Sequence, residues 1–228
     1  WEGRSRAGAT TDVSSDMTKL ALETIGRTGF SYTFGSFERT EPHPFVSAMV
    51  GALTYNQRRA LLKIPAFTKP LFARSDRKYA HNKQYLADVL TDVVRTRRRS
   101  TEEFHDLLQI MMDAAREVDN PNALSEANIG YQILTFLIAG HETTSGALSF
   151  ALYYLATHPE VFERARAEVD EVWGAEKPEF GQVPKLRYVR RVLDESLRLW
   201  PTVPAFGRGA RAETTVGDGY RMAAGDWA

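Results

Sequence analysis

The spacing of apolar residues predicts a chain made mostly of helices. Between Ser14 and Gly29, apolar positions recur at helical spacing, and Ser14 or Ser15 is the expected N-cap. The stretch Ser31–His43 is aromatic and polar without a clear period, which predicts a loop. A second helix is expected from Pro44 to about Leu62, because proline suits the first turn of a helix.

A long helix is expected from Ser75 to Arg99, after a connection interrupted by Pro65 and Pro70. Basic residues crowd its end, where they favour the negative pole of the helix dipole, so we interpret them as a solvated helix end and not as a nucleic-acid patch. Its apolar side would hold Tyr79, Leu86, Val89, Leu90 and Val93, and the basic residues are Arg95, Arg97, Arg98 and Arg99.

The longest predicted helix covers about Glu126–Thr157, with Ser125 as its N-cap. A short helix at Glu102–Ala115 and a loop at Asp119–Asn122 precede it. Its residues are apolar on nearly all faces between Ile129 and Leu155, so we expect it to be buried through the centre of the domain.

The last part of the chain changes from helices to short strands. Pro159 begins a helix that ends near Gly174, and another helix at Arg187–Leu199 is stopped by Pro201. Two short strands are expected afterwards, at Thr202–Phe206 and at Thr214–Met222, the latter with a Gly-Asp-Gly turn. The predicted fold class is therefore mainly α, with short β-strands near the C-terminus.

Composition narrows the classes of function. The 228 residues suffice for one large domain, and 29 basic residues balance 29 acidic ones, which argues against general nucleic-acid binding. No stretch approaches the ~18 apolar residues that span a membrane. The absence of cysteine excludes disulfides and thiolate-bound metals within this chain, and it fits a cytoplasmic protein. The chain starts at Trp1 without a methionine, so we expect the natural start to be missing.

Polar residues interrupt the longest helix at Ala139–Ser145. Thr143 lies one helical turn after Ala139, so its hydroxyl can bond back to that carbonyl and bend the helix. Gly140 lets a flat ligand or a bent backbone approach closely. A polar kink without any ligand is the alternative. A zinc-protease site is poorly supported, because that pattern needs a second histidine where Ser145 stands.

Glu195 and Arg198 are three residues apart on one face of the predicted helix Arg187–Leu199, so they can form an ion pair. Such pairs are common on helix surfaces and contribute little there. Taken alone, this pair is therefore an ordinary surface feature.

The two motifs together resemble the cytochrome P450 superfamily of haem-thiolate monooxygenases. Ala139–Thr144 is similar to the oxygen-binding motif of that family's central helix, and Glu195–Arg198 is similar to its structural Glu-x-x-Arg pair, with Pro201 following. The resemblance covers residues 1–228 as a partial haem domain, which would lack the first helices and the cysteine region of the family. The chain is most similar to the self-sufficient fatty-acid hydroxylases, although residues 60–75 depart from them. That likeness rests on residues 16–18, 24–26, 42–45, 131–133 and 199–202.

The resemblance implies a role for each residue of the candidate site. Thr143 would hold dioxygen or its water and help deliver protons, and Glu142 would be the acid that supplies them. The cofactor would be contacted by Ala139, Gly140, Thr143 and Thr144. Glu195 and Arg198 would be a structural pair behind the haem, with both side chains buried and hydrogen-bonded. Five residues would contact substrate: Met49 and Leu53 on the roof of its channel, and Val203, Pro204 and Ala205 from the strand after the last helix.

The reaction implied is insertion of one oxygen atom from dioxygen into a C–H bond of a small apolar substrate, plausibly a fatty acid. Heme b would be held through its iron by a cysteine that this chain lacks, so no residue here is a metal ligand. A reductase partner or fused domain would supply electrons from NADPH through FAD and FMN. The 228 residues alone would be inactive. Two alternatives stay open at this point: a non-catalytic helical relative, and a ligand-binding or interaction module with the same fold.

Overall fold

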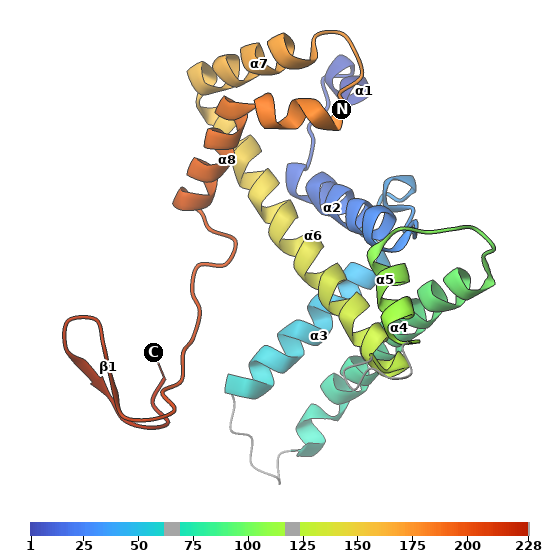
Figure 1. Ribbon diagram of the computed structural model, residues 1–228, viewed down its shortest axis with the longest axis vertical. Helices are drawn as coiled ribbons and strands as arrows, with labels where there is room; N and C mark the ends of the chain where they lie inside the picture. Colours follow the sequence, from blue (N-terminus) through green and yellow to red (C-terminus); the bar gives the residue numbers. More distant parts are fainter. Residues whose placement is uncertain (62–68, 117–123, 228) are drawn as a thin grey trace. The chain divides into compact units, whose positions relative to one another are not determined.

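A computed structural model of the chain describes residues 1–61, 69–116 and 124–227. Two predicted features, Pro65 and the loop Asp119–Asn122, lie outside these ranges. The described parts are mainly helical, as expected, with one two-stranded hairpin (Figure 1). The helices are α1 (Glu2–Arg6), α2 (Val13–Phe30), η1 (Ser36–Glu38), α3 (Pro44–Leu61), α4 (Lys69–Arg99), α5 (Leu107–Ala114), α6 (Glu126–Thr157), α7 (Pro159–Trp173), η3 (Phe180–Lys185) and α8 (Arg187–Leu199); the strands are β1 (Thr214–Val216) and β2 (Tyr220–Met222).

The chain forms two compact units, Trp1–Leu152 and Tyr153–Ala228, and each is described by itself. The core of the first unit is built from α2, α3, α4, α5 and the first part of α6. Leu22, Phe45 and Met49 are almost completely buried in it, because each lies on the apolar side of its amphipathic helix. The pairing of α3 with α4 is the most extensive helix contact.

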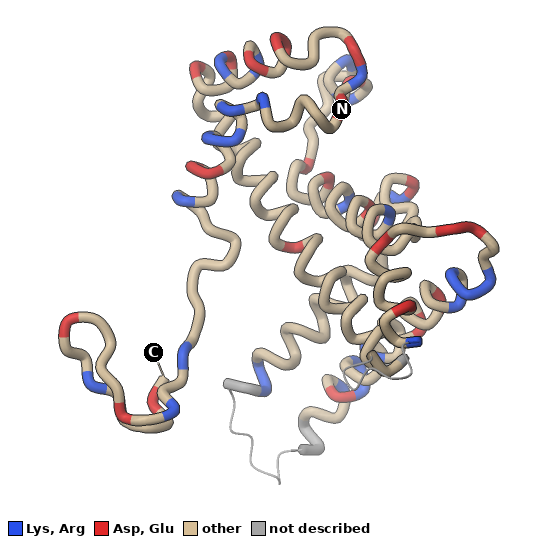
Figure 2. Tube along the Cα trace, in the orientation of Figure 1, with Lys and Arg blue, Asp and Glu red and all other residues tan. Residues whose placement is uncertain are grey.

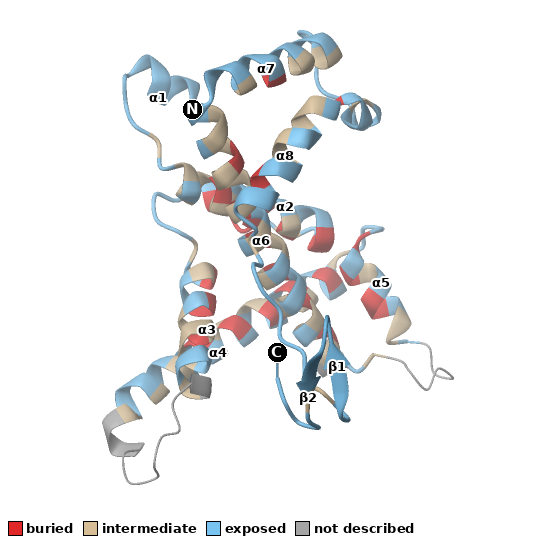
Figure 3. Cartoon of the chain, turned by 90° about the vertical axis from the view of Figure 1, so that its left-hand side faces the viewer, coloured by how far each residue is buried: buried red, intermediate tan, exposed pale blue. Residues whose placement is uncertain are grey.

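Helix α6 buries one stripe, which differs from the expectation of burial on nearly every face. Five buried residues recur every four positions: Ile129, Ile133, Leu137, His141 and Ser145; Ala151, nearer the end of the helix, is also buried. Tyr131 and Phe136, between these positions, are 70% and 39% exposed. Figure 3, coloured by burial, shows exposed and intermediate stretches along α6. The apolar pattern identified the residues that avoid water, but within the described chain neighbours cover only one side of the helix.

Local signals placed most helix ends correctly. Pro44, Ser125 and Pro159 lie where the sequence predicted starts, and the backbone N–H of Asn128 donates to the Ser125 hydroxyl at 3.2 Å. The predicted cap of α2 was wrong: Asp12 is the N-cap, and its carboxylate accepts from the N–H of Ser15 at 3.0 Å. A carboxylate two residues earlier therefore serves in place of the serine hydroxyls.

Two other starts differ from the prediction. Helix α4 already includes Lys69, six residues before the predicted start at Ser75, and Pro70 is therefore part of the helix. Helix α5 begins at Leu107 instead of Glu102, since Asp106 is its N-cap and accepts from the N–H of Gln109 at 3.0 Å. No helix in the described ranges is both long and apolar enough to cross a bilayer.

Arg97 corrects the interpretation of the basic helix end as wholly solvated. Its side chain is 4% exposed and forms a two-point ion pair with Asp106, whose side chain is 7% exposed. The same guanidinium donates to the carbonyl of Phe30 at 3.1 Å and lies over the ring of Phe104. Arg95, Arg98 and Arg99 are exposed, as predicted. One arginine of the basic run at the end of α4 is therefore buried, while the others are exposed.

The second unit joins α7 to α8 through a carboxylate. Glu168 of α7 accepts from the N–H groups of Tyr188 and Val189 at 2.8 and 2.9 Å, at the start of α8. Its pKa is lowered, because these bonds outweigh the opposing effect of burial. The carboxylate thus satisfies N–H groups that the first turn of a helix leaves unpaired.

Of the two segments predicted as strands near the C-terminus, only Thr214–Met222 contains strands. Strands β1 and β2 pair antiparallel, with Thr214 opposite Met222, around a turn in which Gly217 and Gly219 have positive φ. Thr202–Phe206 is not a strand, which corrects the prediction. Pro204 has no N–H to donate to a ladder, and no described strand pairs with this segment.

Candidate functional site

The polar segment of α6 lies within the helix, as predicted, and satisfies its own hydrogen bonds. The Thr143 hydroxyl donates to the Ala139 carbonyl at 2.6 Å, which is the expected bond across one helical turn. The Ser145 hydroxyl donates to the Glu142 carbonyl at 3.0 Å, and Ser149 donates to Ser145 at 2.6 Å. These polar side chains are tolerated here because carbonyl groups of the helix backbone accept hydrogen bonds from their hydroxyls.

His141 is a core residue of this segment. Its side chain belongs to the buried stripe of α6, and Nδ1 lies 3.1 Å from the Leu137 carbonyl. Since a carbonyl can only accept, this contact assigns the ring proton to Nδ1. Burial lowers the pKa of His141, so the neutral ring is favoured near neutral pH. His141 therefore anchors the helix and is unsuited to donating protons.

Gly140 lies where α6 approaches α2. A Cβ at this position would come within 3.1 Å of the Ile25 side chain. The sequence left open whether Gly140 admits a ligand or a close backbone, and the structure places Ile25 beside it. This glycine thus has a packing role within the first unit, whatever else contacts it.

The remaining residues of the motif are accessible. Ala139, Glu142 and Thr144 are exposed, and Thr143 is half-buried. The small side chain of Ala139 and the back-bonded hydroxyl of Thr143 project little from this face of α6. Such a face fits contact with a flat apolar cofactor such as haem. The sequence has no cysteine, so this chain contributes no thiolate ligand to haem iron. The residues present fit one face of haem.

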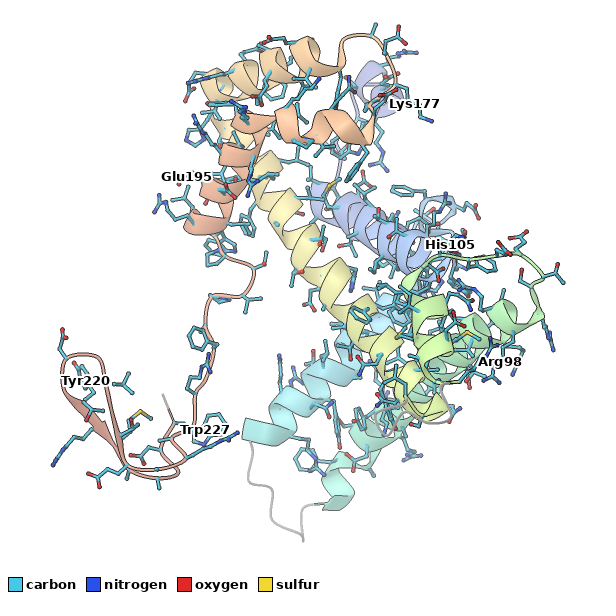
Figure 4. All side chains as sticks on the ribbon, in the orientation of Figure 1. Arg98, His105, Lys177, Glu195, Tyr220 and Trp227 are labelled. Atoms are coloured by element: carbon cyan, nitrogen blue, oxygen red, sulfur yellow. The ribbon has the colours of Figure 1, made fainter. Side chains whose placement is uncertain are left out.

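Glu195 and Arg198 form the predicted pair on α8. Nε and one terminal nitrogen of Arg198 each donate to a different Glu195 carboxylate oxygen, both at 2.7 Å. The hydrogen bond from Arg198 lowers the pKa of Glu195, and the same bond raises the pKa of Arg198. We expected both side chains to be buried, but that of Glu195 is 56% exposed and that of Arg198 is 67% exposed. Figure 4 labels Glu195 on α8. The two-point geometry is present, and the burial is not.

A pocket of about 310 Å³ lies beside this pair in the second unit. Tyr154 and His158 from the end of α6, and Tyr188 and Leu199 from α8, contribute to its wall. No local sequence pattern predicts this pocket, because its lining comes from three separate helices. Val203, Pro204 and Ala205, predicted to contact substrate, are exposed in the segment after α8.

The two substrate-contact residues predicted on α3 lie in the core of the first unit. Met49 is 1% exposed, and Leu53 is half-buried against the same cluster. None of the described cavities is lined by either residue. Their role toward a substrate therefore stays a prediction.

Comparison with known proteins identifies relatives over nearly the whole chain. The sequence profile described as Cytochrome P450 matches residues 1–227. A bifunctional cytochrome P450/NADPH–P450 reductase from Bacillus cereus is 42% identical over 216 residues, which cover 94% of this chain and 20% of the relative. A second one, from Bacillus subtilis, is 41% identical over 217 residues, with the same coverage. A self-sufficient cytochrome P450 monooxygenase from Phanerodontia chrysosporium is 38% identical over 91% of this chain and 19% of the relative. The chain thus spans about a fifth of the length of these relatives.

Proposed function

Since the chain belongs to the cytochrome P450 family, we propose that the protein of which it forms part is a monooxygenase. In the reaction, a C–H bond of a small apolar substrate becomes C–OH, and the second oxygen atom of dioxygen leaves as water. NADPH supplies two electrons, and one further proton comes from solvent. Residues 1–228 would be part of the haem domain.

The bond between the Thr143 hydroxyl and the Ala139 carbonyl carries this proposal. It holds the hydroxyl in one orientation at a half-buried point on the accessible face of α6. While its single proton bonds to the Ala139 carbonyl, the hydroxyl oxygen can accept a hydrogen bond from a water molecule, and it can pass on a proton when that back-bond opens. The exposed carboxylate of Glu142, the preceding residue, can exchange protons with solvent. Consecutive residues of a helix do not face each other, so the proposed path from Glu142 to Thr143 would run through bound water.

Haem, when bound, supplies the redox chemistry of oxygen activation. The residues of this chain would shape one face of its site. Ala139 would project little from the side of α6 that faces haem, and Thr144 would lie at the edge of that side. Thr143 would relay the proton needed in the reaction. Gly140 and His141 fix α6 against the core of the first unit, so that this surface keeps its position.

Glu195 and Arg198 would act as a positioning pair and not as catalytic residues. Their two parallel hydrogen bonds define the direction of both side chains on α8. A planar guanidinium held at two points is a rigid element against which another part of the complete protein can pack. This role fits a pair that stays exposed in the described part of the chain.

The substrate is proposed to be a fatty acid, and the electron donor a fused reductase carrying FAD and FMN. The reductase is supported by the names of the relatives from Bacillus cereus and Bacillus subtilis, which include an NADPH–P450 reductase. The fatty acid is supported by the resemblance of residues 16–18, 24–26 and 42–45 to fatty-acid hydroxylases. A location in the cytoplasm fits the same assignment.

Isotope labelling of the complete protein tests this function. The protein is incubated with NADPH, decanoate and isotopically labelled dioxygen, and the products are analysed by mass spectrometry. We expect hydroxydecanoate that carries one labelled oxygen atom per molecule. Label that comes from water instead of dioxygen, or no hydroxylated product from any fatty acid, would contradict the proposal.

The isolated 228 residues are proposed to be inactive, because they contain no cysteine for the haem iron. The measurement is the absorbance of the reduced protein with haem and carbon monoxide. The complete protein should give the thiolate-type band, and the isolated chain should not. A thiolate-type band from the isolated chain would overturn this argument.

A further inference from the structure

A second candidate site lies between α3 and α4, at a pocket of about 530 Å³ that we call the α3–α4 pocket. Its volume is within the range of small-molecule sites, ~300–1,000 Å³. None of the residues assigned above to the reaction contributes to it. Its lining consists of Gly51, Thr54, Tyr55, Arg58, Arg59, Phe72, Ser75, Lys78, Tyr79 and Asn82.

Stacked aromatic rings form one wall of this pocket. The rings of Tyr55 and Tyr79 are 4.2 Å apart between centroids and are inclined by only 14°. At Gly51, a Cβ would come within 2.5 Å of the amide nitrogen of Asn82, a buried residue of α4. Glycine therefore permits the two helices to approach closely beside the stacked rings. The pocket has a fixed apolar wall next to a tight helix contact.

Positive charge surrounds this apolar wall. Arg58, Arg59 and Lys78 line the pocket, and none of the described residues that line it is acidic. The nearby carboxylate of Asp76 accepts from the Tyr55 hydroxyl at 2.6 Å. Arg59 lies over the ring of Tyr55, 5.8 Å from its centroid. Among the residues that the structure describes, neither Arg58 nor Lys78 has a carboxylate partner. Figure 2 shows this basic end of α3 in blue.

An amphipathic anion matches this combination of groups. The aromatic rings and the aliphatic stems of Arg58 and Lys78 favour a ligand with an apolar body. The charged ends of the same two side chains favour a ligand with an anionic head group. A neutral apolar molecule would leave the cations without a partner, and an inorganic anion would leave the rings unused.

We propose that the α3–α4 pocket binds a single-chain carboxylic acid, with its carboxylate at Arg58 and Lys78 and its chain against Tyr55 and Tyr79. The ligand class overlaps with the fatty acids of the proposed function and rests on it to that extent. Binding at this pocket is measurable without any turnover.

Photolabelling of the complete, haem-loaded protein tests the proposal. A decanoate analogue with a diazirine in its chain is irradiated with the protein in the absence of NADPH, and labelled peptides are mapped by mass spectrometry. We expect label on peptides that contain Tyr55, Phe72 or Tyr79. The double variant Arg58→Gln/Lys78→Gln should lower that label about tenfold or more at limiting probe, the loss expected for one charge-assisted contact.

Two controls separate charge at the pocket from charge in general. Arg77→Gln removes an exposed cation next to Lys78 that does not line the pocket, so labelling should change less than about twofold. The corresponding diazirine alcohol should label the double variant and the unmodified protein equally, because it has no carboxylate.

Three outcomes would overturn the inference: label only on other peptides, equal labelling in the double variant, or equal losses in both charge variants. A fourth outcome would assign the basic residues to a lipid surface. In that case the unmodified protein binds vesicles of phosphatidylserine and phosphatidylcholine, the double variant does not, and neither protein is labelled by the decanoate probe. Failure of the proposed function would give a different result. A protein that is labelled at the pocket but does not hydroxylate decanoate would support the binding site and contradict the proposed substrate.

Discussion

Arg97 at the end of α4 contacts Asp106, the N-cap of α5, through both terminal nitrogens of its guanidinium. The remaining bonds of this pair complete a buried network. Asp106 also accepts from the Ser31 hydroxyl at 2.7 Å and from the N–H of Gln109, and Arg97 donates to the Phe30 carbonyl. One ion pair therefore connects the ends of α2 and α4 with the start of α5.

Removing Arg97 should strongly destabilise the domain. Arg97→Gln leaves the Asp106 carboxylate buried without its cation, which typically costs about 3–5 kcal/mol. Arg95→Gln, at an exposed position of the same helix, should change the free energy of unfolding by less than about 0.5 kcal/mol. Urea unfolding of the complete haem domain measures both. Equal effects of the two substitutions would show that the network contributes little.

The same network predicts a loss of stability in acid. Burial opposes ionisation of Asp106, but hydrogen bonds from Arg97, Ser31 and Gln109 outweigh it, so its pKa is lowered from 3.8. A carboxyl with a lowered folded-state pKa stabilises the protein above its unfolded pKa, and this contribution is lost as pH falls through the folded value. The free energy of unfolding should therefore fall below about pH 4. Asp106→Asn should start less stable and lose less over that window, and parallel pH curves would refute this assignment.

Gly140 and Gly130 offer a matched test of helix packing. Both lie in α6, but a Cβ at Gly140 would meet Ile25 at 3.1 Å, and a Cβ at Gly130 would meet nothing within 4 Å. Gly130→Ala should stabilise the domain by about 0.5–1 kcal/mol through helix propensity. Gly140→Ala should destabilise it by about 1 kcal/mol, because overpacking outweighs that gain. If thermal unfolding shows the same sign for both, α2 does not pack against Gly140 as described.

The two-point pair on α8 predicts a specific requirement for arginine. Arg198→Lys keeps the charge but cannot form two parallel bonds to Glu195, so the yield of haem-loaded complete protein should fall nearly as far as with Arg198→Ala. Arg190 provides the control, because its contact with Asp194 on the same helix is a single, longer one at 3.9 Å. Arg190→Ala should leave the yield of holoprotein unchanged. Normal haem loading in Arg198→Lys would show that only the charge is needed.

Much of this fold could be predicted because its signals are local. Pro44, Ser125 and Pro159 mark helix starts by their own chemistry, and a back-bond such as that of Thr143 depends only on a spacing of four residues. Burial was harder to predict, since it depends on which neighbours cover a helix. The sequence therefore misjudged Arg97, the exposed face of α6 and the exposure of Glu195 and Arg198.

The α3–α4 pocket could not have been found from the sequence. Tyr55 and Tyr79 stack only because two separate helices pair in one register, which no short motif encodes. A cationic and aromatic composition on both helices, with Arg58 and Lys78 near the tyrosines, was the only available signal. That composition is equally typical of solvated helix faces.

The proton role of Thr143 is the central claim, and the ratio of hydroxylated product to NADPH oxidised tests it most directly. Thr135 is a matched control, because its hydroxyl makes the same kind of back-bond, to the Tyr131 carbonyl at 2.8 Å, on the same helix. In the complete protein, Thr143→Ala should keep substrate binding and NADPH consumption but release hydrogen peroxide in place of product. The ratio should fall about tenfold or more, since positioned proton transfer contributes ~10²–10⁴-fold to a rate. Thr135→Ala should leave the ratio unchanged, and Thr143→Ser should largely restore it. An unchanged ratio in Thr143→Ala, or an equal loss in Thr135→Ala, would contradict the account.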